Sequence, residues 1–233
     1  MNFVHDIKSI VKRLYVNSLK NIKNSEISNV KLIHKESRIE NSTLFGNIIT
    51  HEGVIIKNAT LMGDITFGRY TTFNGPNSDI LCVLNPVNIG SFCSIARNVT
   101  IQEYNHYSDR VTSYFITHHL FDGKWVEDIK STGPIDIGND VWIGTQSIIL
   151  SGVKVGHGAI IAANSVVTND IPPYSIAAGS PCKVIKLRFS NDIIEKLLIT
   201  KWWEWDIDKI RKNRPFFSGN LTLEKMQNII DCD

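Results

Sequence analysis

The stretch from Ile137 to Pro172 reads IGNDVW-IGTQSI-ILSGVK-VGHGAI-IAANSV-VTNDIP, six consecutive blocks of six residues. Each block opens on Ile or Val, and a small or branched residue follows four positions later. A strict period of six is neither the helical 3.6 nor the strand period of 2, and it is typical of short parallel strands that coil around a prism. The opening residues are therefore predicted to stack inward as aliphatic ladders, at Ile137, Ile143, Ile149, Val155, Ile161 and Val167.

The same period continues towards the N-terminus with shifts of phase. Blocks open at Ile89, Ile95 and Ile101, and weaker runs lie at Ile33, Ile39 and Phe45 and at Ile55, Leu61, Phe67 and Phe73. The longest interruption covers residues 102–134. A long loop inside a compact repeat domain tends to be functional, so we expect the chemistry there. An ordinary sandwich of short strands is the alternative fold, and six blocks in phase argue against it.

Both ends of the chain are predicted to be helical. Residues 1–23 form an amphipathic pattern that suits packing on this chain or on a second subunit, with contact to an anionic membrane surface as an alternative. Ser190 is a candidate N-cap for a second helical part, whose dense tryptophans suit packing better than ligand stacking. The expected domains are an N-terminal helix at 1–28, a β-helix at 29–188 with the loop 102–134, and a helical segment at 189–233.

Composition narrows the class of protein. The net charge of +2 over 233 residues gives no reason to expect a nucleic-acid partner. Four cysteines without a CxxC pair fit a reducing compartment and no structural zinc. The sequence shows neither a long apolar run nor a signal-peptide core, so a cytoplasmic protein is expected.

The residues that end the repeat carry a family resemblance. Residues 170–186 read DIPPYSIAAGSPCKVIK, and KWWEWD follows at 201–206. Together with the hexads these motifs resemble the left-handed β-helix, or hexapeptide-repeat, acyltransferases, in the xenobiotic and sugar O-acetyltransferase branch. The segment KLRF at 186–189 matches that branch only loosely. The resemblance implies an all-β, left-handed parallel helix, a homotrimer, and acetyl-CoA as co-substrate without a metal.

The resemblance also assigns a catalytic base. In the family a histidine follows the hexads that correspond here to IGSFCSI at 89–95, and His106 occupies that place, with His118 and His119 ranked second. A hydroxyl group is a poor nucleophile at neutral pH, and an imidazole can take its proton and return it to the departing thiol. Direct attack requires no acyl-enzyme, so Cys93 and Cys182 are not assigned as nucleophiles.

Further site residues follow from the same resemblance. Gly144 and Thr145 would supply the oxyanion donor, and Trp142 would wall the acceptor or the pantetheine arm unless it is simply an exposed corner aromatic. Asn74 and Asn77 are expected on the acceptor side, where one subunit and its 102–134 loop face the coenzyme groove of the next. The residues expected along the coenzyme are Thr145, Ala163, Thr168, Lys183 and Lys186, the lysines being solvated charges in the alternative.

Three functions stay open. The first is acetylation of a hydroxyl on a surface-polysaccharide sugar or its precursor, favoured because residues 69–78 lack a tyrosine-rich segment typical of antibiotic-modifying members. The second is O-acetylation of a xenobiotic such as chloramphenicol or a streptogramin, or N-acetylation of an amino sugar. The third is a hexapeptide scaffold that binds zinc through histidines on adjacent coils, which the grouping of His106, His118 and His119 in one loop disfavours.

Overall fold

The computed structural model describes residues 21–229, and most of the expected N-terminal helix lies outside them. The predicted boundary of that helix at residue 28 is wrong, because β1 (Ile22–Lys23) and β2 (Glu26–Ser28) are already strands. Ile22 and Ile27 are half-buried and pack against the hydrophobic core. Their burial explains why these residues join the coil rather than a helix.

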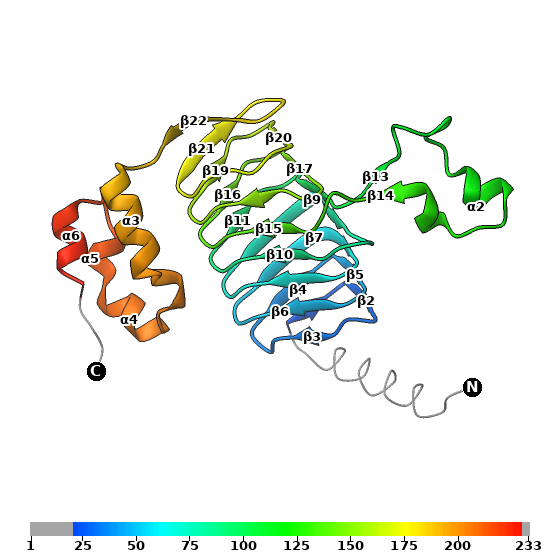
Figure 1. The fold of residues 1–233 in the computed structure, drawn as a ribbon. Helices are drawn as coiled ribbons and strands as arrows, with labels where there is room; N and C mark the ends of the chain where they lie inside the picture. The colour runs from blue at the N-terminus through cyan, green and yellow to red at the C-terminus, as the bar shows by residue number, and fades with distance from the viewer. Residues whose placement is uncertain (1–20, 230–233) are drawn as a thin grey trace. The chain divides into compact units, whose positions relative to one another are not determined.

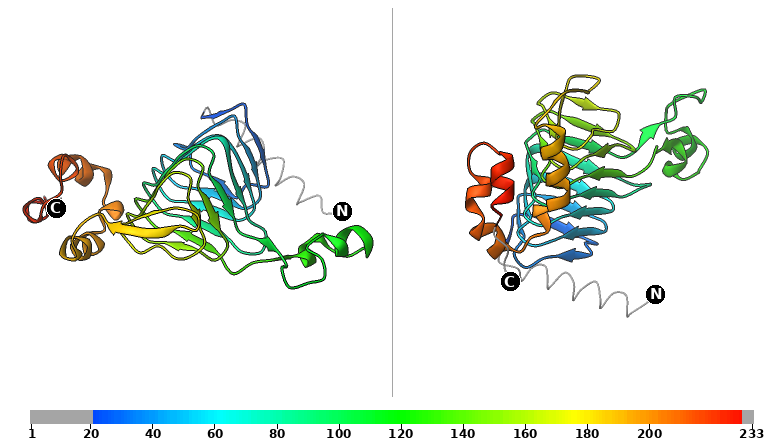
Figure 2. Two further views of the ribbon diagram at one scale, coloured as in Figure 1. Left: turned by 90° about the horizontal axis from the view of Figure 1, so that it is seen from above. Right: turned by 60° about the vertical axis from the view of Figure 1, so that its left-hand side comes forward.

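The repeats form a parallel β-helix with three faces, whose triangular section is visible from above in Figure 2. Strands of successive coils pair in parallel, so each face is a parallel sheet seen in Figure 1 as stacked arrows. We call the corner between the first and second faces the first corner, and the corner between the second and third faces the second corner. This stacked part of the chain is called the prism below.

The strands divide among the faces as follows. The first face contains β1, β4 (Arg38–Glu40), the start of β7 (Ile55–Met62), the start of β9 (Thr72–Leu81), β11 (Ser94–Ile95), β16 (Trp142–Ile143), β19 (Ile160–Ile161) and β21 (Ser175–Ala178), which pairs with β22 (Lys183–Leu187). The second face contains β2, β5 (Thr43–Phe45), the ends of β7 and β9, β12 (Thr100–Gln102), β17 (Ile148–Leu150) and β20 (Val166–Val167). The third face contains β3 (Leu32–Ile33), β6 (Ile48–Thr50), β8 (Ile65–Phe67), β10 (Val87–Ile89), β15 (Ile135–Ile137) and β18 (Lys154–Val155).

The residues that open the six hexads all lie in the core, as predicted. Their side chains are at most 3% exposed, and they sit on neighbouring coils in register, for example Ile143 on Ile161. Burying each such side chain contributes about 1.5–3 kcal/mol, so the ladder is the main source of stability of the prism. The openers are Ile137, Ile143, Ile149, Val155, Ile161 and Val167.

The expected phase is wrong at two places in the early coils. Phe45 is 46% exposed and Leu44 is buried, while Ile55 points outward beside the buried Ile56. The inward positions Ile39 and Leu44 are five residues apart rather than six. The first corner is therefore one residue shorter in these coils, and the tight turn is made by an asparagine, Asn41, with a left-handed φ of 48°.

A long excursion leaves the prism between β12 and β15, and we call residues 103–134 the arm. It contains β13 (Asn105–His106), α2 (Ile116–Leu120), a 3-10 turn η1 (Trp125–Asp128) and β14 (Ile129–Lys130). The strands β13 and β14 pair antiparallel and project from the coil (Figure 1).

The chain divides into two compact units at Lys186 and Leu187. The C-terminal unit contains α3 (Asn191–Thr200), η2 (Trp202–Glu204), α4 (Ile207–Lys212), α5 (Arg214–Phe217) and α6 (Leu223–Gln227). Its tryptophans pack with phenylalanines, since the Trp202 and Phe217 rings are 5.1 Å apart and those of Trp205 and Phe216 are 5.8 Å apart. This agrees with the packing role expected for them. No helix among residues 21–229 is long and apolar enough to cross a membrane.

Candidate active site

His106 lies on the first strand of the arm, and its imidazole is exposed. Across the antiparallel pair it faces Ile129, which is buried. The ring of Phe115 meets the imidazole nearly edge-on, with centroids 4.5 Å apart and planes at 71°. The histidine assigned as base by resemblance is thus accessible to a substrate, and the ring of Phe115 contacts it on one side.

The two second-ranked histidines lie in α2, close to the same phenylalanine. His119 stacks on Tyr114 at 5.3 Å, and its ring is 6.5 Å from that of Phe115. His118 and His119 are both exposed. Within residues 21–229 no three His, Cys, Asp or Glu side chains are placed to share a metal ion.

A buried carboxylate fixes the root of the arm. Glu103 is fully buried and accepts hydrogen bonds from the backbone N–H groups of Val83 and Leu84, each at 3.0 Å, and from the Asn85 amide at 3.0 Å. The same Asn85 amide also donates to the hydroxyl of Ser131, where the arm returns to the prism. Burial acts to raise the pKa of Glu103, but hydrogen bonding by Ser131, Val83, Asn85 and Leu84 outweighs it, so the pKa lies below its ordinary value.

Several predicted residues lie in one row along the first corner. The Asn164 N–H donates to the Thr145 carbonyl at 2.9 Å, which places Ala163 on the coil next to Thr145. On the other side the Thr145 hydroxyl donates to the Arg97 carbonyl at 2.8 Å. One coil earlier, the Asn98 N–H donates to the Pro76 carbonyl, beside Asn77. The expected acceptor and coenzyme residues therefore share this corner.

Asn74 lies on the first face at the same corner. Its side-chain amide donates to the Ile95 carbonyl at 3.3 Å, and its own carbonyl accepts from the Ser78 hydroxyl at 2.7 Å. Asn77 is exposed within β9, where the strand passes the first corner, and has a left-handed φ of 54°. Of the two asparagines, Asn77 is the one whose side chain is open to a ligand.

The structure corrects the oxyanion assignment at Gly144. Its N–H donates to the Ile161 carbonyl at 2.8 Å and so belongs to the ladder between coils. A Cβ added at Gly144 would lie 2.5 Å from the backbone nitrogen of Ala163, which explains why glycine occupies this close approach between coils. The neighbouring Thr145 N–H donates to no acceptor within residues 21–229. Thr145 is therefore the one of the two that can offer its amide.

The remaining predicted residues are exposed but scattered. Trp142 points outward from β16 and is 53% exposed, between Ser94 and Ile160 on adjacent coils. Thr168 follows β20, and its hydroxyl accepts from the Asn169 side chain at 2.9 Å. The two lysines expected to meet phosphates both lie in β22, where every residue is exposed, at Lys183 and Lys186.

The arm and the corner row border opposite edges of the second face. Residue Thr145 precedes β17, whereas the arm leaves the prism at Glu103, directly after β12. The two strands are paired neighbours, so a whole face separates the row from the root of the arm. Because the arm then projects away from the coil (Figure 1), one chain does not bring His106 to its own corner row.

Cys93 and Cys182 are buried in the prism, and neither was expected to act as a nucleophile. Cys93 and Cys182 are 2% and 5% exposed and belong to the core cluster. Burial raises the pKa of Cys93 to about 12, despite lowering contributions from hydrogen bonds. A thiol with that pKa is protonated at neutral pH and is not a nucleophile.

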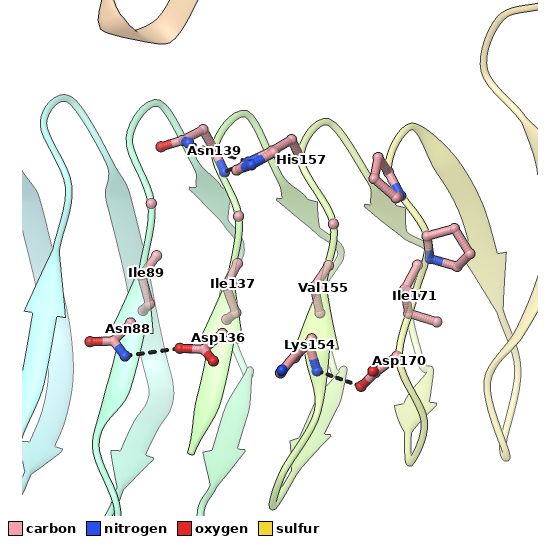
Figure 3. A pocket seen from close by; sticks show the side chains of 15 residues that line it. Asn88, Ile89, Asp136, Ile137, Asn139, Lys154, Val155, His157, Asp170 and Ile171 are labelled. Atoms are coloured by element: carbon pink, nitrogen blue, oxygen red, sulfur yellow. Dashed lines mark hydrogen bonds between the residues drawn. The ribbon is translucent and has the colours of Figure 1, made fainter. Parts of the chain in front are cut away.

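A groove of about 540 Å³ lies on the third face, and its lining contains none of the residues predicted for catalysis, coenzyme binding or acceptor binding (Figure 3). Its polar side chains join successive coils. Asn88 donates to Asp136 at 2.9 Å, and the Lys154 N–H donates to Asp170 at 2.8 Å. The His157 ring accepts from the Asn139 N–H at 2.9 Å. Since these groups complete the coil, we assign the groove no catalytic role.

Comparison with known proteins shows the family to which the chain belongs. A family model described as bacterial transferase hexapeptide (six repeats) matches residues 134–169. A probable macrolide acetyltransferase of Lysinibacillus sphaericus is 41% identical over 148 residues, covering 60% of this chain and 81% of that protein. The chain belongs to the hexapeptide-repeat acyltransferases.

Other members of the hexapeptide-repeat acyltransferases are also similar. A chloramphenicol acetyltransferase of Escherichia coli is 38% identical, covering 57% of this chain and 66% of its own length. A mutant of the N-acyltransferase AntD of Bacillus cereus, solved in complex with dTDP and coenzyme A, gives a TM-score of 0.56 at 20% identity, covering 82% of this chain and 94% of AntD. The fold is a left-handed parallel β-helix, and the predictions of fold class and of acyltransferase activity are confirmed.

Sequence analysis missed the groups that hold the arm of this acyltransferase in place. Glu103, Arg110 and Asp128 make non-periodic contacts, which the hexad repeat does not predict. A usable signal existed only for Glu103, a charged residue two positions after the buried opener Ile101.

Proposed function

We propose that this acyltransferase moves an acetyl group from acetyl-CoA to a hydroxyl group, with His106 as the general base. The observation that carries the proposal is the exposed imidazole of His106 on a projecting arm. The family relationship supports acetyl transfer, and the coenzyme A in the AntD structure supports the donor.

In this proposal His106 accepts the proton of the acceptor hydroxyl as its oxygen attacks the thioester carbonyl. The Thr145 N–H donates to the oxyanion that forms, because the Gly144 N–H is engaged in the ladder. His106 then returns the proton to the sulfur as the carbon–sulfur bond breaks. A base in this role contributes about 10²–10⁴-fold to the rate.

The coenzyme is proposed to lie along the prism. Ala163 is exposed and small, so a pantetheine chain can lie against it. Thr168 offers a hydroxyl, Lys183 and Lys186 offer positive charges for phosphates, and Trp142 provides an apolar wall.

The active site is proposed to form between subunits of a homotrimer. The separation of His106 from the corner row within one chain supports this, because a second copy is then needed to bring them together. In a cyclic trimer the arm of one copy meets the Thr145–Ala163 row of the next, and Asn74 and Asn77 line the acceptor side.

Two acceptor classes are compared. A saccharide hydroxyl fits the exposed aromatic residues near His106, since Trp125 and Tyr114 are 37% and 56% exposed and can stack on a sugar ring. A xenobiotic hydroxyl is favoured instead by the relatives, which are named macrolide and chloramphenicol acetyltransferases. Acetylation of a surface-polysaccharide sugar or its precursor is our first candidate.

The test is release of coenzyme A thiol from acetyl-CoA in the presence of oligosaccharides, nucleotide sugars, a macrolide or chloramphenicol. Wild type is compared with His106→Ala and with His118→Ala, a matched control in the same arm. We expect turnover that only His106→Ala abolishes. Equal turnover in His106→Ala would remove the base assignment, and turnover with the antibiotics alone would select the second acceptor class.

A further inference from the structure

The tip of the arm holds a buried carboxylate that the proposed reaction does not use. Asp128 ends η1 and is only 3% exposed, although the residues around it are largely exposed. Its oxygens accept hydrogen bonds from the N–H groups of Thr117 at 3.2 Å and His118 at 3.0 Å, both in the first turn of α2. A buried charge is tolerated only when it is hydrogen-bonded. Because the donors here are N–H groups of the first helical turn, the carboxylate holds the start of α2 in place.

Arg110 connects the same carboxylate to the strand that bears His106. Its guanidinium lies 3.8 Å from Asp128 and donates to the Glu127 carbonyl at 2.8 Å. It also stacks over the ring of Tyr107, 3.5 Å from the centroid. Tyr107 directly follows His106, so Arg110 ties the end of β13 to η1.

Two residues beside His106, Phe115 and Ile129, are held in place by the contacts of Asp128 and Arg110. Phe115 is the N-cap residue of α2, and the edge-on contact of its ring is the aromatic contact that limits rotation of the imidazole. Ile129, opposite His106 in the strand pair, directly follows Asp128. Displacing Asp128 would therefore loosen the imidazole from two sides.

We propose that Asp128 and Arg110 are positioning residues, which set the orientation of the His106 imidazole through α2 and Phe115. The proposal deepens the function proposed above and depends on it for its catalytic meaning. A general base works only within hydrogen-bond reach of the proton that it takes, and a displacement of about 1 Å can cost about 10²-fold in rate.

The test is an NMR spectrum of the histidine rings in the full-length protein labelled with ¹³C-histidine. The His106 signals are identified by their loss in His106→Ala, and the shift due to Phe115 is the difference between wild type and Phe115→Leu. We expect Asp128→Asn to lose at least half of that shift. Asp109→Asn, the same change at an exposed neighbour whose carboxylate pairs with Lys130, should leave it intact.

A second variant keeps the test decisive if Asp128→Asn does not fold. Arg110→Lys retains the charge at a half-exposed position but loses the stacking on Tyr107, and it should shift the His106 signals in the same direction. His106 signals that superimpose on those of wild type in Arg110→Lys, and in Asp128→Asn if it folds, would overturn the proposal. Failure of the proposed function would appear separately, as unchanged thiol release in His106→Ala.

Discussion

The prism and the arm are stabilised by different interactions. The prism buries stacked aliphatic residues such as Ile143 and Ile161, each fully buried and paired with the same kind of residue one coil away. The arm has little apolar core and depends on buried carboxylates, Glu103 at its root and Asp128 at its tip. The stability of this chain therefore comes mainly from the prism, whereas the residue that we propose as its base lies on the arm.

The largest effect is expected for His106→Ala. Loss of the imidazole should lower acetyl transfer by about 10²–10⁴-fold without changing the melting temperature, because the side chain is exposed and supports no core. Thiol release and calorimetry measure the two quantities on the same sample. A large drop in melting temperature would contradict the separation of the two regions.

A substitution in the core of the prism should lower the stability of the fold, which His106→Ala should leave unchanged. Ile149→Ala removes a fully buried side chain between Ile101 and Val167 and should cost about 2–5 kcal/mol of stability. Ile148→Ala is its matched control, because the neighbouring side chain faces outward and is 37% exposed; it should cost less than about 1 kcal/mol. Thermal unfolding followed by circular dichroism separates them, and equal losses would contradict the assigned phase of the repeat.

An intermediate effect is expected at the root of the arm. Glu103→Gln keeps the shape of the side chain but replaces one accepting oxygen by a donor, which then faces either the N–H groups of Val83 and Leu84 or the amide of Asn85. Leaving such groups unpaired costs on the order of 1–3 kcal/mol. Hydrogen exchange should increase in residues 82–86 and in the arm, and exchange confined to the prism ladders would count against this role.

The smallest effect is expected from pH. Burial acts to raise the pKa of Asp128, but hydrogen bonds from Thr117 and His118 and the charge of Arg110 outweigh it, so the pKa lies below its ordinary value. A carboxyl group with a lowered folded pKa stabilises the fold above its unfolded pKa and loses that contribution as pH falls through the folded value. The protection factor of the Thr117 N–H against hydrogen exchange should therefore be constant from about pH 8 to 5 and decline below about pH 4. A decline centred near neutrality would contradict the assignment.

The prism could be predicted from the sequence because each coil buries an aliphatic residue at the same position of the hexad. The openers from Ile137 to Val167 are all inward, and their order in space follows their order in the chain. The phase failed at Phe45 and Ile55, where the first corner is one residue shorter and the period alone does not reveal it.

The position of the arm in the chain could be predicted from the sequence, but its internal contacts could not. Resemblance singled out His106, yet the contact of Asp128 with Thr117 spans eleven residues without a period, and its geometry exists only in the folded arm. The same limit applied to Gly144, whose N–H was expected to be free to donate to the oxyanion. Its engagement with Ile161 depends on the register between coils, which the hexads do not specify at the level of single hydrogen bonds.

The most direct test of the shared site is complementation between two inactive variants. His106→Ala removes the proposed base, and Ala163→Trp fills the corner row at an exposed position, so each variant should be inactive alone. If the arm of one copy serves the row of the next, co-expressed chains bearing the two changes should regain about a quarter of the wild-type thiol release, the share of interfaces that pair an intact arm with an intact row. Purified mixed trimers that stay as inactive as either parent would contradict the account.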